Sequence, residues 1–275
     1  MTRIVCRQLA PRLGELAANQ RRIVETLAEA TAAGAEVIVL PELATSGYVF
    51  ETEEELKACA ITADDPLLGE WSAAIAGSAS SSAVLVCGFA ELGADGLLYN
   101  SAAVVDAGGT LAVYRKAHLW DREKLFFTPG SELPPVVETA FGRIGVMVCY
   151  DLEFPEFTRA VALAGADLLA IPTNWPWTDR PEGEHAPEVV IAQGTARINH
   201  LAIACCDRSG VERGTRWNEG TALIDPDGWL VAEAGPGADA EAAADLDLAR
   251  SRDKSYNPRN DVLADRRTDL YPSGR

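Results

Sequence analysis

Basic residues are scarce in this sequence, and their scarcity excludes several classes of protein. The 275 residues include 41 acidic but only 24 basic side chains, which gives a net charge of −17. A nucleic-acid-binding protein needs lysine and arginine to displace counterions from the phosphate backbone, and a polybasic membrane anchor needs the same residues. We therefore expect neither nucleic acid nor a membrane surface among the partners of this chain.

Long apolar runs and metal-binding cysteine patterns are also missing. The longest apolar stretch, residues 161–171, is interrupted by Asp167 and is too short to span a bilayer. The six cysteines have irregular spacing, without a C-x-x-C pair or a Cys/His set of zinc type. The start of the chain lacks the basic and apolar regions of a signal peptide. We therefore expect a cytoplasmic protein with reduced thiols.

The hydrophobic residues, 48% of the chain, form short runs that alternate with segments of helical period. The runs predict strands at residues 4–9, 36–40, 83–89, 97–106, 110–115, 142–150, 167–172, 201–206, 221–225, 229–233 and 245–248. Helical spacing predicts helices at residues 19–33, 67–76, 155–164 and 186–199. This order predicts an α/β domain with mixed sheets over residues 1–250. A polar tail, residues 251–275, is expected to pack on the body or at a subunit interface.

Three reactive side chains stand at the ends of predicted strands. They are Glu42, Lys116 and Cys149. Ligands gather at the carboxyl ends of strands in α/β sheets, so a carboxylate, an ammonium and a thiol are expected at one rim. This set suits nucleophilic catalysis, because the carboxylate takes the thiol proton and the ammonium favours the resulting anion. The simpler alternatives are an exposed loop acid, a surface lysine and a core thiol.

The sequence around these three residues resembles the signature motifs of the nitrilase superfamily of carbon–nitrogen hydrolases. The motifs are LPELATSGY at residues 40–48, YRKAHL at residues 114–119 and VCYDLEFPE at residues 148–156. The resemblance covers nearly the whole chain. It implies an α-β-β-α sandwich of two mixed sheets flanked by helices, and a homodimer or larger homo-oligomer.

The resemblance also implies a role for each reactive residue. Glu42 matches the general base, Lys116 the electrostatic partner and Cys149 the nucleophile. A second family glutamate matches Glu123, in a loop of variable length, so Asp121 remains a rival. The plain alternative for Glu123 is a solvated loop acid.

The reaction implied by the resemblance needs no metal or organic cofactor. Cys149 attacks an amide carbonyl, and Lys116 together with the backbone N–H of Tyr150 holds the oxyanion. The residues expected to form the substrate pocket are Tyr48, Trp120, Asn174, Trp175 and Trp177. Aromatic walls with few polar groups favour a small aliphatic amide, which would be hydrolysed to a carboxylic acid and ammonia. The alternatives are an N-carbamoyl amino acid hydrolase, a nitrilase, or a non-catalytic family member that binds a ligand or partner.

Three further side chains near the motifs carry expectations of their own. A Cys-His enzyme needs an imidazole beside the thiol, and only three histidines exist. His118 stands two residues after Lys116 and is interpreted as structural. Arg159 is expected to pair with a nearby glutamate such as Glu156 or Glu153. Arg180 lies in the loop at residues 176–187, and one interpretation is that its side chain faces the substrate.

Overall fold

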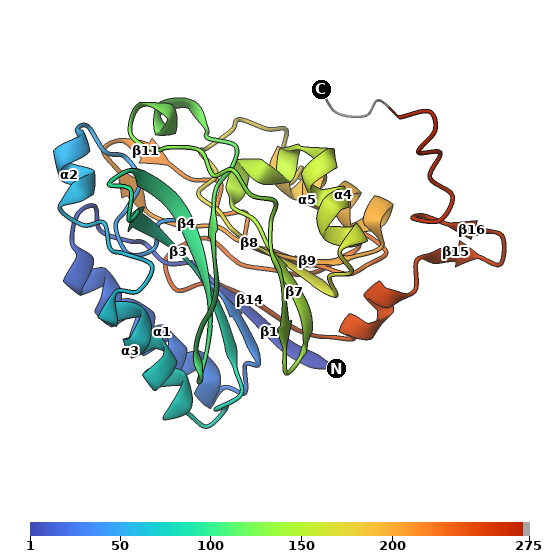
Figure 1. Ribbon diagram of the computed structural model, residues 1–275, viewed down its shortest axis with the longest axis horizontal. Helices are drawn as coiled ribbons and strands as arrows, with labels where there is room; N and C mark the ends of the chain where they lie inside the picture. Colours follow the sequence, from blue (N-terminus) through green and yellow to red (C-terminus); the bar gives the residue numbers. More distant parts are fainter. Residues whose placement is uncertain (272–275) are drawn as a thin grey trace.

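The computed structural model describes residues 1–271, which fold into a four-layered sandwich (Figure 1). Two six-stranded sheets pack against each other and helices cover their outer faces. The first sheet has the order β14 (Glu241–Leu246), β1 (Thr2–Arg7), β2 (Val37–Val39), β3 (Val84–Leu92), β4 (Leu98–Asp106) and β5 (Gly109–Arg115). The second has the order β13 (Leu230–Glu233), β12 (Ala222–Ile224), β9 (Ala202–Cys206), β8 (Leu168–Pro172), β7 (Gly142–Val146) and β6 (Val136–Thr139). The expected α-β-β-α fold is confirmed.

Four helices form the outer layers. Helices α1 (Leu16–Ala32) and α3 (Pro66–Ala76) cover the first sheet, and α4 (Pro155–Leu163) and α5 (Pro187–Asn199) cover the second. Shorter elements occupy the connections: α2 (Glu53–Lys57), the 3-10 helices η1 (Asp121–Leu125), η2 (Cys149–Glu153) and η3 (Leu248–Arg252), and the hairpins β10 (Val211–Glu212) with β11 (Thr215–Arg216) and β15 (Ser255–Asn257) with β16 (Asn260–Asp261). The ends of the predicted helices lie within about three residues of the observed ends.

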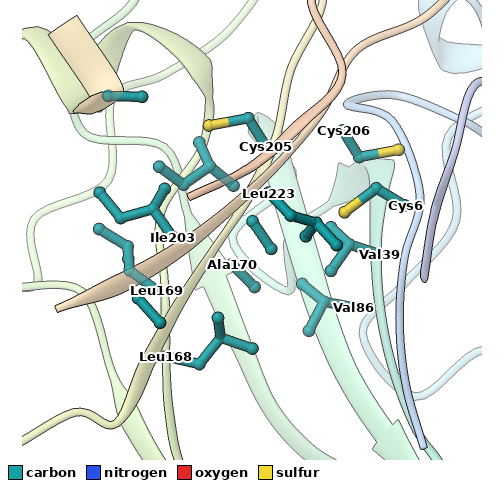
Figure 2. Close-up of a cluster of buried hydrophobic side chains, with 14 of the residues drawn as sticks. Cys6, Val39, Val86, Leu168, Leu169, Ala170, Ile203, Cys205, Cys206 and Leu223 are labelled. Carbon is teal, nitrogen blue, oxygen red and sulfur yellow. The ribbon is translucent and has the colours of Figure 1, made fainter. Parts of the chain in front are cut away.

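The main hydrophobic core lies between the two sheets. Figure 2 shows Cys6, Val39 and Val86 of the first sheet near Leu168 and Ala170 of the second. Residues two apart on a strand share one face, so the intervening side chains of the first sheet point to α1 and α3 instead. Burial on both faces explains why β2 and β8, and β3 as far as Ala90, are continuous apolar runs without polar alternation.

Parallel pairing sets the position of the chemistry-bearing segments. Strands β1, β2 and β3 are mutually parallel in the first sheet, as are β7, β8 and β9 in the second. Parallel strands end at the same edge of a sheet, so the segments that follow β7, β8 and β9 are neighbours there. These segments carry Cys149, Asn174 and Asp207.

Several element boundaries differ from the sequence prediction. The strand predicted at residues 142–150 ends at Val146, and Cys149 begins the 3-10 helix η2 instead. The closing strand lies at residues 241–246 rather than 245–248, and its alanine-rich sequence lacks a strong strand pattern. Strand β6 and helix α2 were not predicted. Arg159 does not pair with Glu156 or Glu153, because its guanidinium donates to the carbonyl oxygens of Val262 and Ile198.

The tail begins against the end of α5 and then leaves the body. The Lys254 ammonium donates to the carbonyl oxygens of Asn199 and His200, at 3.1 and 2.8 Å. Beyond this anchor, the β15–β16 hairpin projects to the side of the molecule (Figure 1). Residues 272–275 of the predicted tail lie outside the described residues. Within residues 1–271, no helix has the length and apolar character needed to cross a membrane.

Candidate active site

A buried ammonium shared by two carboxylates forms the centre of the site. Nζ of Lys116 lies 2.7 Å from Oε1 of Glu42 and 2.7 Å from Oε1 of Glu123, and all three side chains are buried. Nδ2 of Asn100 donates to Oε1 of Glu42 at 2.7 Å, and the Tyr48 hydroxyl donates to Oε1 of Glu123 at 2.5 Å. Buried charges are stable only when paired and hydrogen-bonded, and this cluster meets both conditions.

Two members of the cluster follow strands, and the third lies on a short 3-10 helix. Glu42 follows β2, and Gly88 on β3 permits the close approach, since a Cβ there would lie 2.5 Å from the Glu42 Cα. Lys116 follows β5, and its backbone is held by an N–H donated to the Asn100 carbonyl at 2.8 Å. Glu123 lies on η1, where its second oxygen accepts the Trp120 N–H at 3.1 Å. Contacts with the backbone of neighbouring segments therefore fix the positions of Glu42, Lys116 and Glu123.

Cys149 occupies a constrained turn at the start of η2. Its φ of 48° lies in the left-handed region, which residues with side chains seldom adopt. The residue is 5% exposed, and its Sγ lies 4.0 Å from the carbonyl oxygen of Asn174. A sharp turn that presents a side chain from the end of a strand is typical of catalytic nucleophiles.

The charged groups of the cluster shift the pKa of the Cys149 thiol. Burial raises the pKa of Glu42 to about 7, with Lys116 lowering it and Glu123 raising it further. Burial and the Glu42 charge raise the pKa of the Cys149 thiol, whereas Lys116 lowers it. Burial alone would lower the pKa of Lys116, but Glu123 and Glu42 together hold it well above its ordinary value. The site thus combines a protonated thiol, a permanent cation and a carboxylate able to exchange a proton near neutral pH.

One oxygen of Glu42 is left for chemistry. Within the described part of the chain, Oε1 is engaged by Lys116 and Asn100, while Oε2 is buried and has no hydrogen-bond partner. A buried carboxylate oxygen without a partner is unusual in a folded protein and frequent at functional sites.

His118 has a structural position. Its backbone N–H and its Nδ1 both contact Oδ1 of Asp151, at 2.9 and 2.8 Å. Its ring stacks on Phe154 with a centroid separation of 3.6 Å. The buried Asp151 also accepts the Tyr114 hydroxyl and the Val148 N–H, so it ties the Lys116 segment to the Cys149 turn. This placement agrees with the structural interpretation of His118.

A cavity of about 230 Å³ adjoins the cluster, with Glu123 and Tyr48 in its wall. The other lining residues are largely apolar: Val49, Phe50, Trp120, Asp121, Arg122, Phe126, Phe127, Pro176 and Thr215. Tyr48 and Trp120 line this cavity together with Glu123, whereas Cys149 is not among its lining residues. Tyr150, adjacent to the thiol, lines a neighbouring hollow and packs edge-on against Trp120 with a centroid distance of 4.8 Å.

Two of the tryptophans expected in the pocket lie elsewhere. Trp175 is 3% exposed and belongs to the hydrophobic core, where its apolar ring packs against Gly220. Trp177 is 41% exposed and lies in a separate surface hollow, with Arg180 and Arg216 over its faces. Arg180 belongs to that hollow and not to the cavity beside Glu123.

The structure adds two residues that the sequence prediction omitted as site residues. Asn100, in the middle of the apolar strand β4, holds Glu42. The sequence feature that could have indicated Asn100 is a polar amide within a run of buried residues. Asp207 follows β9 and accepts the backbone N–H of Trp175 at 2.9 Å. Its signal was the same strand-end position that pointed to Glu42 and Cys149.

Comparisons with known proteins agree with this geometry. The sequence matches the carbon-nitrogen hydrolase family over residues 3–256, and the chain belongs to that family. It is therefore similar to enzymes of the nitrilase superfamily along nearly its whole length, as the motifs predicted.

Individual relatives cover the chain almost completely. A nitrilase from Pyrococcus abyssi is 35% identical over 98% of this chain and 99% of its own length. An N-carbamoylputrescine amidase from Arabidopsis thaliana is 33% identical over 94% of this chain and 90% of its own. The solved structure of an amidase from Nesterenkonia sp. is 26% identical, covers 98% of this chain and 94% of that one, and superposes with a TM-score of 0.78. The chain is thus a carbon–nitrogen hydrolase of amidase-like character.

Proposed function

We propose that this protein hydrolyses a small, uncharged, apolar amide to a carboxylic acid and ammonia through a thioester on Cys149. The observation that carries this proposal is the buried Glu42–Lys116–Glu123 cluster, whose charges act on the Cys149 thiol. Acyl transfer to sulfur requires a thiol, a base whose pKa lies near the working pH, and a fixed cation.

In the first half-reaction, Sγ of Cys149 attacks the amide carbonyl carbon and its proton passes to Glu42. Oε2 is the oxygen that accepts this proton, because Oε1 is engaged by Lys116 and Asn100. The negative charge that develops on the substrate oxygen is held by the Lys116 ammonium and the Tyr150 backbone N–H. Glu42 then delivers the proton to the departing amine, and the C–N bond breaks.

In the second half-reaction, Glu42 takes a proton from a water molecule, which attacks the thioester carbonyl. The carboxylic acid leaves, and the proton returns to the Cys149 sulfur. Glu123 orients Lys116 and the Tyr48 hydroxyl throughout, and it contacts substrate from the cavity wall.

The cavity supports an aliphatic acyl group. Its volume of about 230 Å³ and its Val49, Phe50, Phe126 and Phe127 walls fit a short apolar chain. Structures of the Nesterenkonia amidase include a mutant in complex with butyramide and mutants in which acrylamide or the acetamide moiety of fluoroacetamide is bound to the active-site cysteine. These compounds are small amides, the class that we propose for this chain.

An N-carbamoyl substrate is the second candidate. Asp121 lies in the cavity wall and offers a carboxylate to a substrate with a distant ammonium. The Arabidopsis thaliana relative named N-carbamoylputrescine amidase shares 33% identity with this chain over 94% of its length. Such a substrate would release carbon dioxide as well as ammonia.

Ammonia release over a substrate panel tests the proposal. The panel contains butyramide, butyronitrile, an N-carbamoyl amino acid and N-carbamoylputrescine, each with the wild type and with Cys149→Ala. We expect butyramide to give the highest kcat/KM and Cys149→Ala to abolish release. Turnover by Cys149→Ala at the wild-type rate would contradict the mechanism. A higher kcat/KM for a carbamoyl compound than for butyramide would show that the substrate is a carbamoyl compound and not an aliphatic amide.

We also propose that the active form is a homodimer or larger homo-oligomer. Helices α4 and α5, which contact each other, and the tail expose apolar side chains: Leu163, Val190, Ile198, Tyr256, Leu270 and Tyr271. Exposed apolar side chains on neighbouring helices favour contact with a second copy.

A further inference from the structure

Asp207 is a buried carboxylate whose partners are backbone N–H groups from three segments. Its Oδ1 accepts from Trp175 at 2.9 Å and from Arg208 at 2.8 Å, and its Oδ2 accepts from Gly220 at 2.9 Å. The side chain is fully buried at the end of β9. Burial raises the pKa of Asp207 to about 7, and the donated backbone hydrogen bonds offset only part of the lost solvation.

The N–H that Asp207 holds belongs to a peptide unit in contact with the nucleophile. The Trp175 N–H and the Asn174 carbonyl are the two ends of one planar peptide bond. That carbonyl oxygen lies 4.0 Å from Sγ of Cys149. Fixing the N–H therefore fixes the carbonyl, and Asp207 is separated from the sulfur by a single rigid plane.

The side chain of Asn174 links the same peptide to the segment that holds the base, Glu42. Its Nδ2 donates to the backbone carbonyl of Glu42 at 2.9 Å, in a buried contact between the two sheets. Asn174 thus contacts the thiol through its backbone and the segment of the base through its side chain. A tilt of the 174–175 peptide plane would disturb both contacts.

We propose that Asp207 is a positioning residue that holds the Asn174–Trp175 peptide, and through it both Cys149 and Glu42, in their reactive arrangement. This inference rests on the proposed role of Cys149 as nucleophile. The competing account makes Asp207 a purely structural tie between the ends of β8, β9 and β12. That account predicts lower stability with unchanged reactivity of the folded enzyme.

The rate at which iodoacetamide alkylates Cys149 separates the two accounts. The reaction forms a sulfur–carbon bond with loss of iodide and the thiol proton, so it reports on the thiol without any substrate. It is measured by mass spectrometry of the Cys149 peptide in the wild type, Asp207→Ala and Asp207→Asn. The matched control is Asp225→Asn, because Asp225 likewise accepts two backbone N–H groups, from Asp227 and Trp229, in a distant turn.

Positioning by Asp207 predicts graded losses. Asp207→Ala should slow alkylation by about tenfold to a hundredfold, the range for losing a hydrogen bond to a charged group. Asp207→Asn should lose less, because its amide oxygen still accepts the Trp175 N–H. The same order is expected in kcat for the amide, with KM changed by less than about threefold. Asp225→Asn should match the wild type in both measurements.

Two results would overturn the inference: an alkylation rate in folded Asp207→Ala within about twofold of the wild type, or a faster rate, since simple loosening exposes the thiol. If Asp207→Ala does not fold by circular dichroism, Asp207→Asn decides by the same criteria. If the Asp207 variants slow alkylation but Cys149→Ala retains turnover, the proposed function is wrong, and the result still supports the positioning of the Cys149 thiol by Asp207. If turnover needs Cys149 but alkylation is unchanged, only the positioning fails.

Discussion

At the scale of single residues, the site depends on how one lysine is shared. Lys116 is one of four lysines in the chain, and it is fully buried between Glu42 and Glu123. Burial raises the pKa of Glu42 to about 7, with Lys116 lowering it and Glu123 raising it, so this one of the two carboxylates can exchange a proton near neutral pH. The other, Glu123, is held by the Tyr48 hydroxyl.

The raised pKa of Glu42 predicts the acid limb of the pH profile. Only ionised Glu42 can accept the thiol proton, so kcat/KM should fall as the pH decreases through about 7. The measurement is kcat/KM for butyramide between pH 5 and pH 9, with circular dichroism at each pH as the folding control. A constant kcat/KM from pH 5 to pH 8 in folded enzyme would exclude Glu42 as the base.

The hydroxyl of Tyr48 supplies a second prediction at this scale. Tyr48→Phe removes the hydrogen bond to Oε1 of Glu123, which should lower kcat by about tenfold. Tyr99→Phe is the matched control, because the Tyr99 hydroxyl donates to the exposed Asp95 at 2.7 Å. Steady-state kinetics check both variants. Equal kcat values for the two would show that Tyr48 does not orient Glu123.

At the scale of elements, strand ends position the chemistry and glycine allows them to approach. Gly88 on β3 faces the Glu42 segment, where an added Cβ would lie 2.5 Å from the Glu42 Cα and 2.6 Å from the Leu43 nitrogen. Both neighbours are backbone atoms, which cannot move aside as a flexible side chain can. The approach of β3 to the residue after β2 therefore depends on glycine.

Gly88→Ala should displace Glu42 and reduce kcat by about a hundredfold, since a misplacement of about 1 Å has an effect of that size. Gly69→Ala is the control. Gly69 lies inside α3, nothing lies within 4 Å of a Cβ there, and alanine favours a helix. Kinetics and thermal melts of both variants check the prediction. A fully active Gly88→Ala enzyme would contradict the proposed dependence on the Glu42 position.

The sequence allowed most elements to be predicted, and the failures have local physical reasons. Helix α3 and strand β8 were predicted within one residue, because Pro66, Gly77 and Pro172 mark their ends. Strand β6 was missed because it is short and follows the prolines at positions 134 and 135. The strand before Cys149 was predicted too long, since apolar side chains continue through a turn that only tertiary contacts impose.

The reactive residues were predictable for a different reason than their supports. Glu42, Lys116 and Cys149 lie within motifs and at strand ends, so sequence alone drew attention to them. Asn100 and Asp207 act through backbone and side-chain contacts from distant segments, and only the fold shows these contacts. Trp175 and Trp177 resembled pocket walls in sequence, but packing directed one to the core and the other to a separate hollow.

At the scale of the whole molecule, charge and apolar surface have separate consequences. The net charge of −17 is spread over the chain and disfavours anionic partners. The exposed apolar residues of α4, α5 and the tail instead favour a second copy of the chain. The surface charge has little effect on the proposed chemistry, because the reactive cluster is buried and neutral amides carry no net charge.

Oligomerisation through the α4–α5 face predicts a specific variant effect. Ile198→Glu places a charge on that face, and we expect it to lower the molar mass measured by light scattering to that of a monomer. Val211→Glu is the control, because Val211 is an exposed apolar residue on the distant β10 hairpin, 69% exposed against 46% for Ile198, and its substitution should leave the molar mass unchanged. A wild type that is monomeric throughout the micromolar range would contradict the proposed assembly.

The central claim is the thioester on Cys149, and intact-protein mass spectrometry tests it most directly. Enzyme quenched in acid during butyramide turnover should gain the mass of one butyryl group, and peptide mapping should place that group on Cys149. The adduct should disappear as substrate is exhausted. An acyl group on another residue, or turnover by Cys149→Ala at the wild-type rate, would contradict the account.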